Sequence, residues 1–299
     1  MSPSQNKLFF KWSEAFDSAR HKLLAIRQQE GIEEVKRKGI IIDKNVSLST
    51  YLEFCKGEPS ISVKHHLIDG KIEAYEMPLD PHSLIQAKLT NIMDNWNDQL
   101  LAMGETDIIV NANSVYRPDI CVRPVNRRRP SRAQAINSTG LPYPTMVVEI
   151  GSTESLNHMH DKVANYFSVR TTIQIYLAIK LYLRLQNNTF ALLALLYLRN
   201  NQNPTIPVIA KSFGIASLSN ISRAYLLNTI RVPVNMITGV DDEFGGIPCN
   251  GANIPGYQID IPAELLFNDV PDGVPGDAPV NFNIDLWKLQ NRISVGLSL

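Results

Sequence analysis

Two acidic residues, Asp119 and Glu149, stand at the ends of two predicted strands. Asp119 follows Pro118 and opens a short apolar stretch at residues 120–122, and Glu149 follows Val147-Val148 without a break. Taken singly, each has a structural explanation, because an Asp after Pro often caps a turn and an acid at a strand end can face water. A carboxylate at the end of a mostly buried strand, however, needs a metal ion or a hydrogen-bonded partner, since burial of an unpaired charge is costly.

Together the two acids predict a metal site. Two carboxylates on neighbouring strand ends can converge on one Mg²⁺ (or Mn²⁺), and Mg²⁺ takes oxygen ligands and keeps several waters. Such an ion lowers the pKa of a bound water and offsets charge on a phosphate oxygen, which hydrolysis of a phosphodiester requires. We therefore predict that Asp119 and Glu149 lie on adjacent strands and are metal ligands.

The composition is that of an ordinary folded protein. Of the 299 residues, 44% are hydrophobic and 19% are charged, which allows a substantial core. The formal net charge is zero, so any binding of nucleic acid must come from a local patch. The three cysteines are too few and too widely spaced for a disulfide framework or a zinc motif, and they favour a reducing compartment.

Neither the N-terminus nor the interior of the chain predicts secretion or a membrane span. The first ten residues lack the apolar core of a signal peptide. The most apolar region, residues 173–198, is interrupted by Lys180 and Arg184, whereas a span needs about 20 predominantly apolar residues. We expect an intracellular protein of the cytoplasm or nucleus that is not secreted and does not bind a membrane.

The elements around the two acids form an α/β pattern. Asp69-Gly70, between two apolar segments, is a strong hairpin signal. Strands are predicted at residues 66–68, 72–75, 107–110, 120–122, 145–150, 173–185 and 189–198, the last two joined by a turn at Asn187-Asn188. Helices are predicted at residues 47–54, 82–103 and 156–167.

The segments on either side of this pattern differ from it. Residues 1–46 are predicted to be an N-terminal helical extension, with a helix at 13–38 that starts at Ser13 and stops at Gly39. Residues 47–200 form the predicted main domain. Residues 201–299 are rich in Pro and Gly, and we expect them to be irregular and partly packed on that domain. From residue 240 on we expect loops and short helical turns, with one helix after Asn283.

Several short motifs share an order with a known group of proteins. They are Leu48–Leu52, Ile68–Ile72, Met77-Pro78 with His82, Arg117–Ile120, Val147–Ser152, Asp161-Lys162 with Tyr166, and Pro255–Phe267. In this order the chain resembles the PD-(D/E)XK nuclease superfamily and, more narrowly, the Uma-type restriction-endonuclease-like family, over about residues 47–267. The resemblance implies a central mixed sheet flanked by helices, a divalent metal, and DNA as the partner.

One position departs from the superfamily's pattern. Its lysine stands two residues after the acid, where this chain has Gly151. The resemblance implies that a lysine on the next helix substitutes, and Lys162 is the candidate for a positive charge at the scissile phosphate. Alternatively, Lys162 pairs with Asp161 or Glu154 on the surface.

Other polar residues are supporting candidates. His82 matches the family's histidine and would order the metal site, contact phosphate or only cap its helix. Glu73 and Glu76 follow the hairpin turn, and either could supply a further acid. His158 and His160 would point to different faces of a helix, so we expect no shared metal from that pair.

An arginine-rich loop lies between the two acids. Its residues Arg127, Arg128 and Arg129 could follow the phosphate backbone of DNA. Alternatively, these arginines are simply solvated, as arginines in a loop more often are.

Three functions are compatible with these patterns. The first is a Mg²⁺-dependent endodeoxyribonuclease that hydrolyses phosphodiester bonds in DNA with Asp119, Glu149 and Lys162. The second is a catalytically inactive nucleic-acid-binding or regulatory protein that keeps the nuclease fold. The third is an interaction protein whose partner docks on the C-terminal segment. A homodimer is left open.

Overall fold

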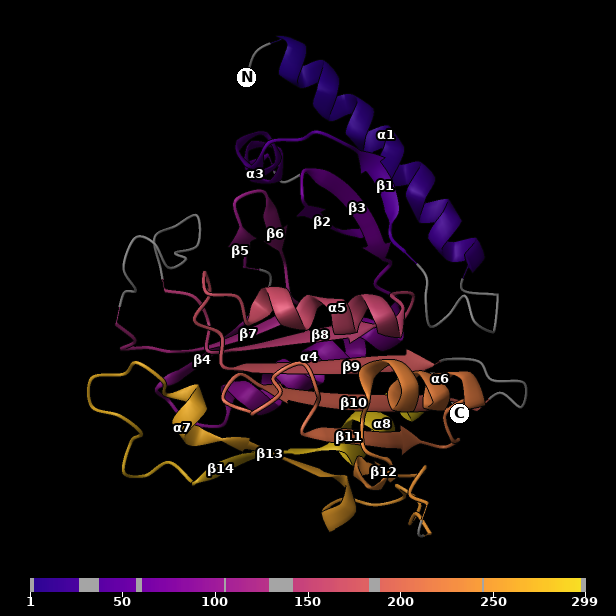
Figure 1. Cartoon of the computed structure of the whole chain (residues 1–299), viewed down its shortest axis with the longest axis vertical. Coiled ribbons are helices and arrows are strands. Elements are labelled where there is room, and N and C mark those ends of the chain that lie inside the picture. Colours follow the sequence, from indigo (N-terminus) through magenta and orange to yellow (C-terminus); the bar gives the residue numbers. More distant parts are fainter. Residues whose placement is uncertain are drawn as a thin grey trace.

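Two β-sheets lie one above the other along the long axis of the molecule (Figure 1). They are seen in a computed structural model, which describes residues 3–26, 38–57, 61–104, 106–128, 142–182, 189–243 and 245–296. The helix α5 (Leu156–Tyr166) lies between the two sheets. The predicted acids are at this junction.

The smaller sheet has five strands in the order β1-β3-β2-β6-β5. The strands are β1 (Ile40–Asp43), β2 (Lys64–Ile68), β3 (Lys71–Glu76), β5 (Ile108–Asn111) and β6 (Ser114–Tyr116). One face packs on the helices α1 (Pro3–Ile26) and α3 (Leu48–Lys56) through a cluster that includes Trp12, Phe54 and Leu67. The other face, which carries His66 and Tyr75, points toward His158 of α5.

The larger sheet has seven strands in the order β12-β11-β10-β9-β8-β7-β4. The strands are β4 (Leu100–Met103), β7 (Ile120–Pro124), β8 (Met146–Gly151), β9 (Ile175–Tyr182), β10 (Ala191–Leu198), β11 (Ile209–Gly214) and β12 (Ile237–Gly239). The pairs β8·β9 and β11·β12 are parallel and the others are antiparallel. This mixed sheet with helices on both faces confirms the predicted fold class.

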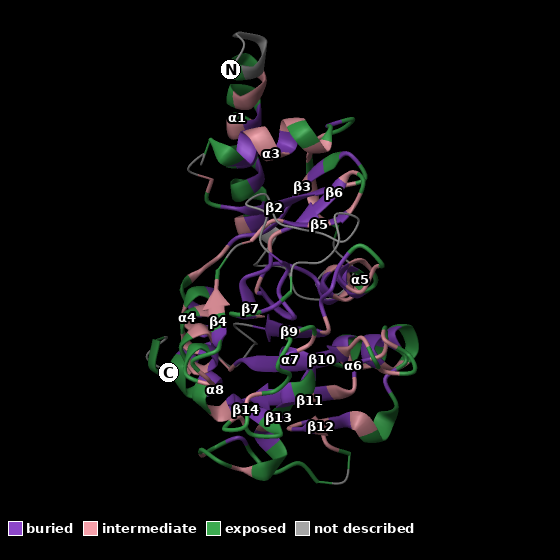
Figure 2. Ribbon diagram, turned by 90° about the vertical axis from the view of Figure 1, so that its left-hand side faces the viewer, coloured by how far each residue is buried: buried purple, intermediate pink, exposed green. Residues whose placement is uncertain are grey.

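The two faces of the larger sheet are covered by different helices (Figure 2). One face packs on α4 (Asp80–Asp94) and α8 (Leu286–Gly296), together with α7 (Ala263–Leu266) and the paired strands β13 (Gln258–Pro262) and β14 (Asn281–Asp285). The other face packs on α5, α6 (Asn220–Tyr225) and the π-helical turn Leu226–Ile230. Short 3₁₀ turns occupy Val234–Met236 and Pro255–Tyr257.

The alternation of side chains along β8 decides which face carries Glu149. Met146, Val148 and Ile150 belong to the cluster under α4 and α8, and Val147 belongs to the cluster under α5. Successive side chains of a strand point to opposite faces. Glu149 therefore faces α5.

Most of the predicted elements around the acids are confirmed. The hairpin at Asp69-Gly70 joins β2 to β3, and both turn residues have the positive φ that a tight two-residue turn uses (46° and 75°). The helix at 47–54 and the strands at 107–110, 120–122, 145–150, 173–185 and 189–198 correspond to α3, β5, β7, β8, β9 and β10. The predicted helix at 156–167 corresponds to α5, which Ser155 caps by accepting from His158 N. The predicted turn at Asn187-Asn188 lies outside the described residues.

The predicted helix at 82–103 is wrong in its second half. The helix α4 ends at Asp94, and residues 100–103 form β4 beside β7. Asn95, Asn97 and Asp98 lie between them, and such side chains favour turns by bonding to nearby main-chain groups. The apolar residues after this turn belong to a strand and no longer continue the helical stripe.

The N-terminal segment also differs from its prediction. The helix α1 starts ten residues before Ser13, whose hydroxyl lies inside the helix and donates to Phe9 O at 3.1 Å. Phe9 and Trp12 pack against Phe54, with ring centroids 5.2 and 5.1 Å apart, and this contact stabilises the early turns. Residues 27–37 of the predicted helix lie outside the described residues. The strand β1, which was not predicted, makes this segment part of the smaller sheet.

The C-terminal segment is more ordered than predicted. The strands β11 and β12 extend the larger sheet, β13 and β14 pair with each other, and Ile259 and Ile284 are fully buried. The helix expected after Asn283 is confirmed as α8. The paired strands β13 and β14, which pack into the main core, correct the expectation that the chain from residue 240 on holds loops and short turns alone, whereas the described residues of 240–254 and 268–280 are loops as expected. Within the parts of the chain that are described, none of the helices has both the length and the apolar character needed to traverse a bilayer.

A histidine in the core of the smaller sheet should make stability depend on pH. Burial, followed by the charge of Arg117, lowers the pKa of His65 to about 3. Since the unfolded chain takes up this proton near pH 6.5, the stabilisation is complete above that pH and is lost as the pH falls toward 3.

We therefore expect His65→Gln to flatten the fall in unfolding free energy below pH 6.5 by up to about 1.4 kcal/mol per pH unit. Urea unfolding at pH 4 to 7 measures that slope. His21→Gln, at an exposed position in α1, is the matched control and should keep the parent slope. An equal slope in both variants would contradict the assignment.

Candidate active site

The pairing of β7 with β8 brings the two predicted acids together. The antiparallel register sets Ile120 opposite Val148 and Cys121 opposite Val147. Continued one step beyond the last strand pair, this register would set Asp119, which directly precedes β7, opposite Glu149, and Asp119 Oδ2 accepts from the neighbouring Ile150 N at 2.7 Å. Directly opposed side chains have Cβ atoms about 4.5–5.5 Å apart and lie on the same face of the sheet. The two acids therefore lie at neighbouring strands, Asp119 just before β7 and Glu149 within β8, and their shared role as metal ligands stays a prediction.

Asp119 is surrounded by partners from three elements. The ammonium of Lys64, on β2, forms an ion pair with its Oδ1, and Nε2 of His82, on α4, lies 3.0 Å from the same oxygen. Its Oδ2 accepts from Ile150 N at 2.7 Å. Burial opposes ionisation of Asp119, but Lys64 and His82 outweigh it and hold the pKa of this carboxyl well below its usual range. Asp119 is therefore an anion in the folded protein.

One carboxylate oxygen of Glu149 contacts two side chains of α5. Its Oε1 lies 3.2 Å from Lys162 Nζ and accepts from the hydroxyl of Tyr166. Its Oε2 is buried and has no hydrogen-bond partner among the described residues. Burial raises the pKa of Glu149 more than Lys162 can lower it, because Lys162 is shared with a second carboxylate.

That second carboxylate is Glu154, whose Oε1 lies 2.9 Å from Lys162 Nζ and 2.5 Å from His158 Nδ1. Burial opposes ionisation here too, but Lys162 and His158 lower the pKa of Glu154 to about 2. Lys162 is 1% exposed, and its ammonium also lies 4.1 Å from the centroid of the Tyr75 ring. It is thus the central cation of a buried cluster, and neither a surface group nor a partner of Asp161 alone.

Glu76 has a structural role beside this cluster. Its carboxylate accepts from the main-chain N–H groups of Ser152, Thr153 and Glu154 at 2.9, 3.1 and 2.6 Å. These bonds fix the loop that follows β8 and hold Glu154 in place. As a candidate further acid, Glu76 already has its carboxylate occupied.

The other predicted candidates are divided between two places. His82 contacts Asp119, as the supporting role requires. Glu73 lies instead near His66 and His158, with its Oε2 3.6 and 4.0 Å from their Nε2 atoms. His160 Nδ1 lies 3.1 Å from Tyr197 OH. His158 and His160 thus turn to different partners, as their spacing on a helix predicts.

Arg127 contradicts the prediction that it follows a phosphate backbone. Its side chain is buried, and it donates to the main-chain oxygens of Tyr143, Thr172 and Asn268 at 2.5, 3.1 and 3.1 Å. An arginine in such a loop is expected to be solvated. Here the segments just before β8 and β9 present main-chain carbonyl oxygens that need donors. Arg128 is exposed, and Arg129 lies outside the described residues.

We expect Arg127→Met to lower the free energy of unfolding by about 3 kcal/mol, because it leaves several buried carbonyl oxygens without donors. Arg128→Met, at the exposed neighbouring position, should change it by less than about 0.5 kcal/mol. Urea unfolding of both variants measures the difference. Equal stabilities would mean that water replaces the guanidinium at no cost.

Sequence reasoning missed two charged residues of the cluster, Lys64 and Glu154. Lys64 begins a strand, and a lysine there is normally solvated. Its contact with Asp119 crosses 55 positions of sequence. From the sequence, Glu154 is expected only as a surface partner of Lys162. The i, i+4 spacing from Glu154 to His158 was the one local signal that could have indicated the pair.

Comparison with known proteins agrees with the motifs. A family model described as "Uma2: Putative restriction endonuclease" matches residues 48–194, which include Asp119, Glu149 and Lys162. This match confirms the resemblance to the Uma-type restriction-endonuclease-like family. No curated protein matches the chain.

One solved structure with a match is described as a putative nuclease belonging to DUF820 from Anabaena variabilis. It is 16% identical, covers 60% of this chain and 92% of its own, and has a TM-score of 0.40. A likeness this slight supports no conclusion by itself.

Proposed function

We propose that the chain is a metal-dependent endonuclease that hydrolyses phosphodiester bonds in DNA. The observation that carries the proposal is the buried cluster in which Asp119, just before β7, and Glu149, on the paired strand β8, lie beside Lys64 and Lys162. The match to a restriction-endonuclease family over both residues supports it. Lys64 and Lys162, which lie beside the two carboxylates, could offset negative charge on a phosphate.

The donor atoms fit a hard divalent cation such as Mg²⁺ or Mn²⁺. Glu149 Oε2 is a buried acceptor without a hydrogen-bond partner in the described part of the chain, and Asp119 supplies a second anionic oxygen. Mg²⁺ prefers carboxylate oxygens together with water. Such an ion would activate a water and offset charge on the phosphate. At Asp119 it would take the place that the ammonium of Lys64 occupies.

The surrounding side chains would orient these ligands. Tyr166 donates to Glu149, and the N–H of Ile150 donates to Asp119, so each carboxylate is fixed from one side. Lys162 would supply the positive charge that Gly151 does not carry. Fixed donors and charges act strongly in a water-excluded site and need no rearrangement during reaction.

The acids and Lys162 are buried, so a substrate can reach them only if the protein changes its conformation. Asp119, Glu149 and Lys162 are each no more than 1% exposed. Lys64 of β2 and Tyr75 of β3 lie over the acids and Lys162. A phosphodiester would therefore reach the carboxylates only after the β2–β3 hairpin moves away from them.

The test is cleavage of supercoiled plasmid DNA by the full chain with Mg²⁺ or Mn²⁺, with EDTA and Asp119→Asn as controls. We expect nicked and linear DNA with the metal, and none in either control. Single-stranded RNA run in parallel assigns the substrate. If no divalent cation supports cleavage of DNA, the nuclease proposal is wrong.

A second candidate is a nucleic-acid-binding protein that keeps the fold without catalysis. The observation that favours it is the position of Gly151, where an added Cβ would lie 2.5 Å from Met159 Sδ. The usual lysine therefore has no room at that position unless Met159 moves. A mobility shift of DNA without cleavage would favour this candidate.

A further inference from the structure

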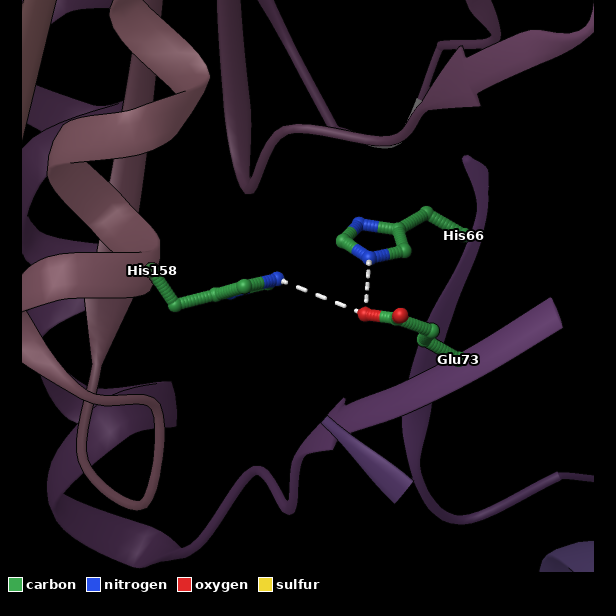
Figure 3. A group of neighbouring side chains, drawn as sticks. All are labelled: His66, Glu73 and His158. Carbon is green, nitrogen blue, oxygen red and sulfur yellow. Dashed lines mark ion pairs between the residues drawn. The ribbon is translucent and has the colours of Figure 1, made fainter. Parts of the chain in front are cut away.

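Three side chains, one each from β2, β3 and α5, point toward one another, as Figure 3 shows. His66 and Glu73 are register partners in the β2·β3 pair, and His158 lies in the first turn of α5. Glu73 Oε2 lies 3.6 Å from His66 Nε2 and 4.0 Å from His158 Nε2. One ligand atom from each of the three residues can be chosen so that all lie within 4.8 Å of one another.

Among the described residues, His66 and His158 have ring nitrogens without a hydrogen-bond partner. His66 is fully buried, and neither of its ring nitrogens has a hydrogen-bond partner among the described residues. Its ring contacts Tyr75 and Tyr116, with centroids 4.5 and 5.2 Å away. His158 Nε2 also has no hydrogen-bond partner there. Unpaired buried polar atoms are costly, so they point to a ligand that satisfies them.

The opposite nitrogen of His158 is held as metal-bound histidines usually are. Its Nδ1 lies 2.5 Å from Glu154 Oε1, and Lys162 Nζ lies 2.9 Å from the same oxygen. With the proton on Nδ1, the lone pair of Nε2 points toward Glu73. A carboxylate behind a histidine fixes its tautomer and makes the other nitrogen a better ligand.

We propose that His66, Glu73 and His158 bind one Zn²⁺, at a site separate from Asp119 and Glu149. Two imidazoles and one carboxylate suit zinc, whereas Mg²⁺ prefers oxygen ligands alone. Zinc bonds of about 2.0–2.2 Å in a tetrahedral arrangement set ligand atoms roughly 3.3–3.5 Å apart. The observed separations are 3.6 and 4.0 Å from Glu73 to the two histidines, and all three ligand atoms lie within 4.8 Å of one another, so the side chains must close by up to about 1.5 Å.

The proposed zinc would join parts of the molecule that are distant in sequence. His66 and Glu73 belong to the smaller sheet, and His158 belongs to the helix that covers the larger one. A narrow pocket lined by Tyr75, Glu154 and His158, among others, reaches His158 but is too tight for a water molecule, so side chains must move to admit the ion. The zinc would hold the β2–β3 hairpin against α5, so it would stabilise the folded chain in the closed arrangement and oppose the hairpin movement that the proposed function needs.

The test is Zn²⁺ binding by the full chain in competition with a chromophoric chelator. We expect one Zn²⁺ per chain, an upward shift of Tm with zinc, and visible absorption by Co²⁺ in its place. His158→Gln should weaken binding at least about 100-fold, and Glu154→Gln by about 10–100-fold. His160→Gln, two residues further along the same helix, should bind like the parent.

Two results would overturn the proposal. One is the absence of Zn²⁺ and Co²⁺ binding by the folded parent. The other is equal zinc affinity of the His158→Gln and His160→Gln variants, which would place the ion elsewhere, for example at Asp119 and Glu149. Neither readout depends on DNA cleavage, so the zinc site and the nuclease proposal can fail separately.

Discussion

Replacing Lys162 by Met should destabilise the protein by about 3–5 kcal/mol, the range for removal of one partner from a buried ion pair. Lys162 is 1% exposed and lies within 3.2 Å of Glu149 and 2.9 Å of Glu154. Its loss leaves two buried carboxylates without that cation. From the sequence alone, the same substitution would be expected to leave the fold intact, because Lys162 looked like a group beside the substrate.

A double-mutant cycle measures this effect. Glu154→Gln combined with Lys162→Met removes one carboxylate together with the ammonium, so the double variant should be more stable than Lys162→Met alone. Urea unfolding gives the four free energies, and Lys71→Met, at an exposed lysine, controls for the loss of a lysine as such. If Lys162→Met is as stable as Lys71→Met, the buried cluster does not depend on this cation.

The parts of the fold that could be predicted carry strong local signals. The β2–β3 hairpin follows from Asp69-Gly70, and β8 follows from a run of apolar residues that ends at Glu149. The position of Glu149 on the face toward α5 then follows from the alternation of a strand. What failed was the assignment of short apolar runs such as 100–103, because four residues fit a helix end as well as an edge strand.

The candidate site could be predicted only where it lies on these strong elements. Asp119 and Glu149 are adjacent because β7 and β8 pair, and both strands were predicted. Lys64 meets Asp119 through the packing of one sheet on another, which no local pattern encodes. The same holds for His66 and His158, whose rings have centroids 5.0 Å apart although 92 positions separate them in the sequence. Long-range contacts between polar residues are the part of the site that needed the structure.

Two buried lysines are candidates for the cationic group of the proposed nuclease. Two lysines lie beside the acids, Lys64 on Asp119 and Lys162 on Glu149. Burial lowers the pKa of each lysine less than its carboxylate partners raise it, so both are charged. Either could face a phosphate once the hairpin has moved. Lys64 moves with the hairpin, whereas Lys162 stays on the helix that covers β8, so Lys162 is the better candidate.

Cleavage of DNA should therefore fall about 100-fold or more when Lys162 is neutralised, comparable to the loss of one fixed donor at a transition-state charge. The comparison should use Glu154→Gln as the parent and Glu154→Gln/Lys162→Met as the variant, because this pair keeps the buried charges closer to balance. Initial rates on plasmid DNA with Mn²⁺, per folded molecule, give the ratio. Lys64→Met, measured in the same way, distinguishes the two lysines. If only Lys64→Met loses activity, the catalytic charge belongs to β2.

A lysine introduced at position 151 should restore part of the DNA cleavage that is lost without Lys162. Because a Cβ at Gly151 would meet Met159 Sδ at 2.5 Å, Gly151→Lys alone should disturb the packing of α5 on β8. Combined with Met159→Ala, the new side chain has space at the end of β8, beside Glu149. In the Lys162→Met/Glu154→Gln background we expect it to recover at least part of the lost cleavage, about 10-fold, as general charge stabilisation at the phosphate predicts. Met159→Ala without the new lysine is the control, and it should recover nothing. Equal rates with and without the restored lysine, in chains of equal stability, would contradict the idea that Lys162 replaces the superfamily's lysine.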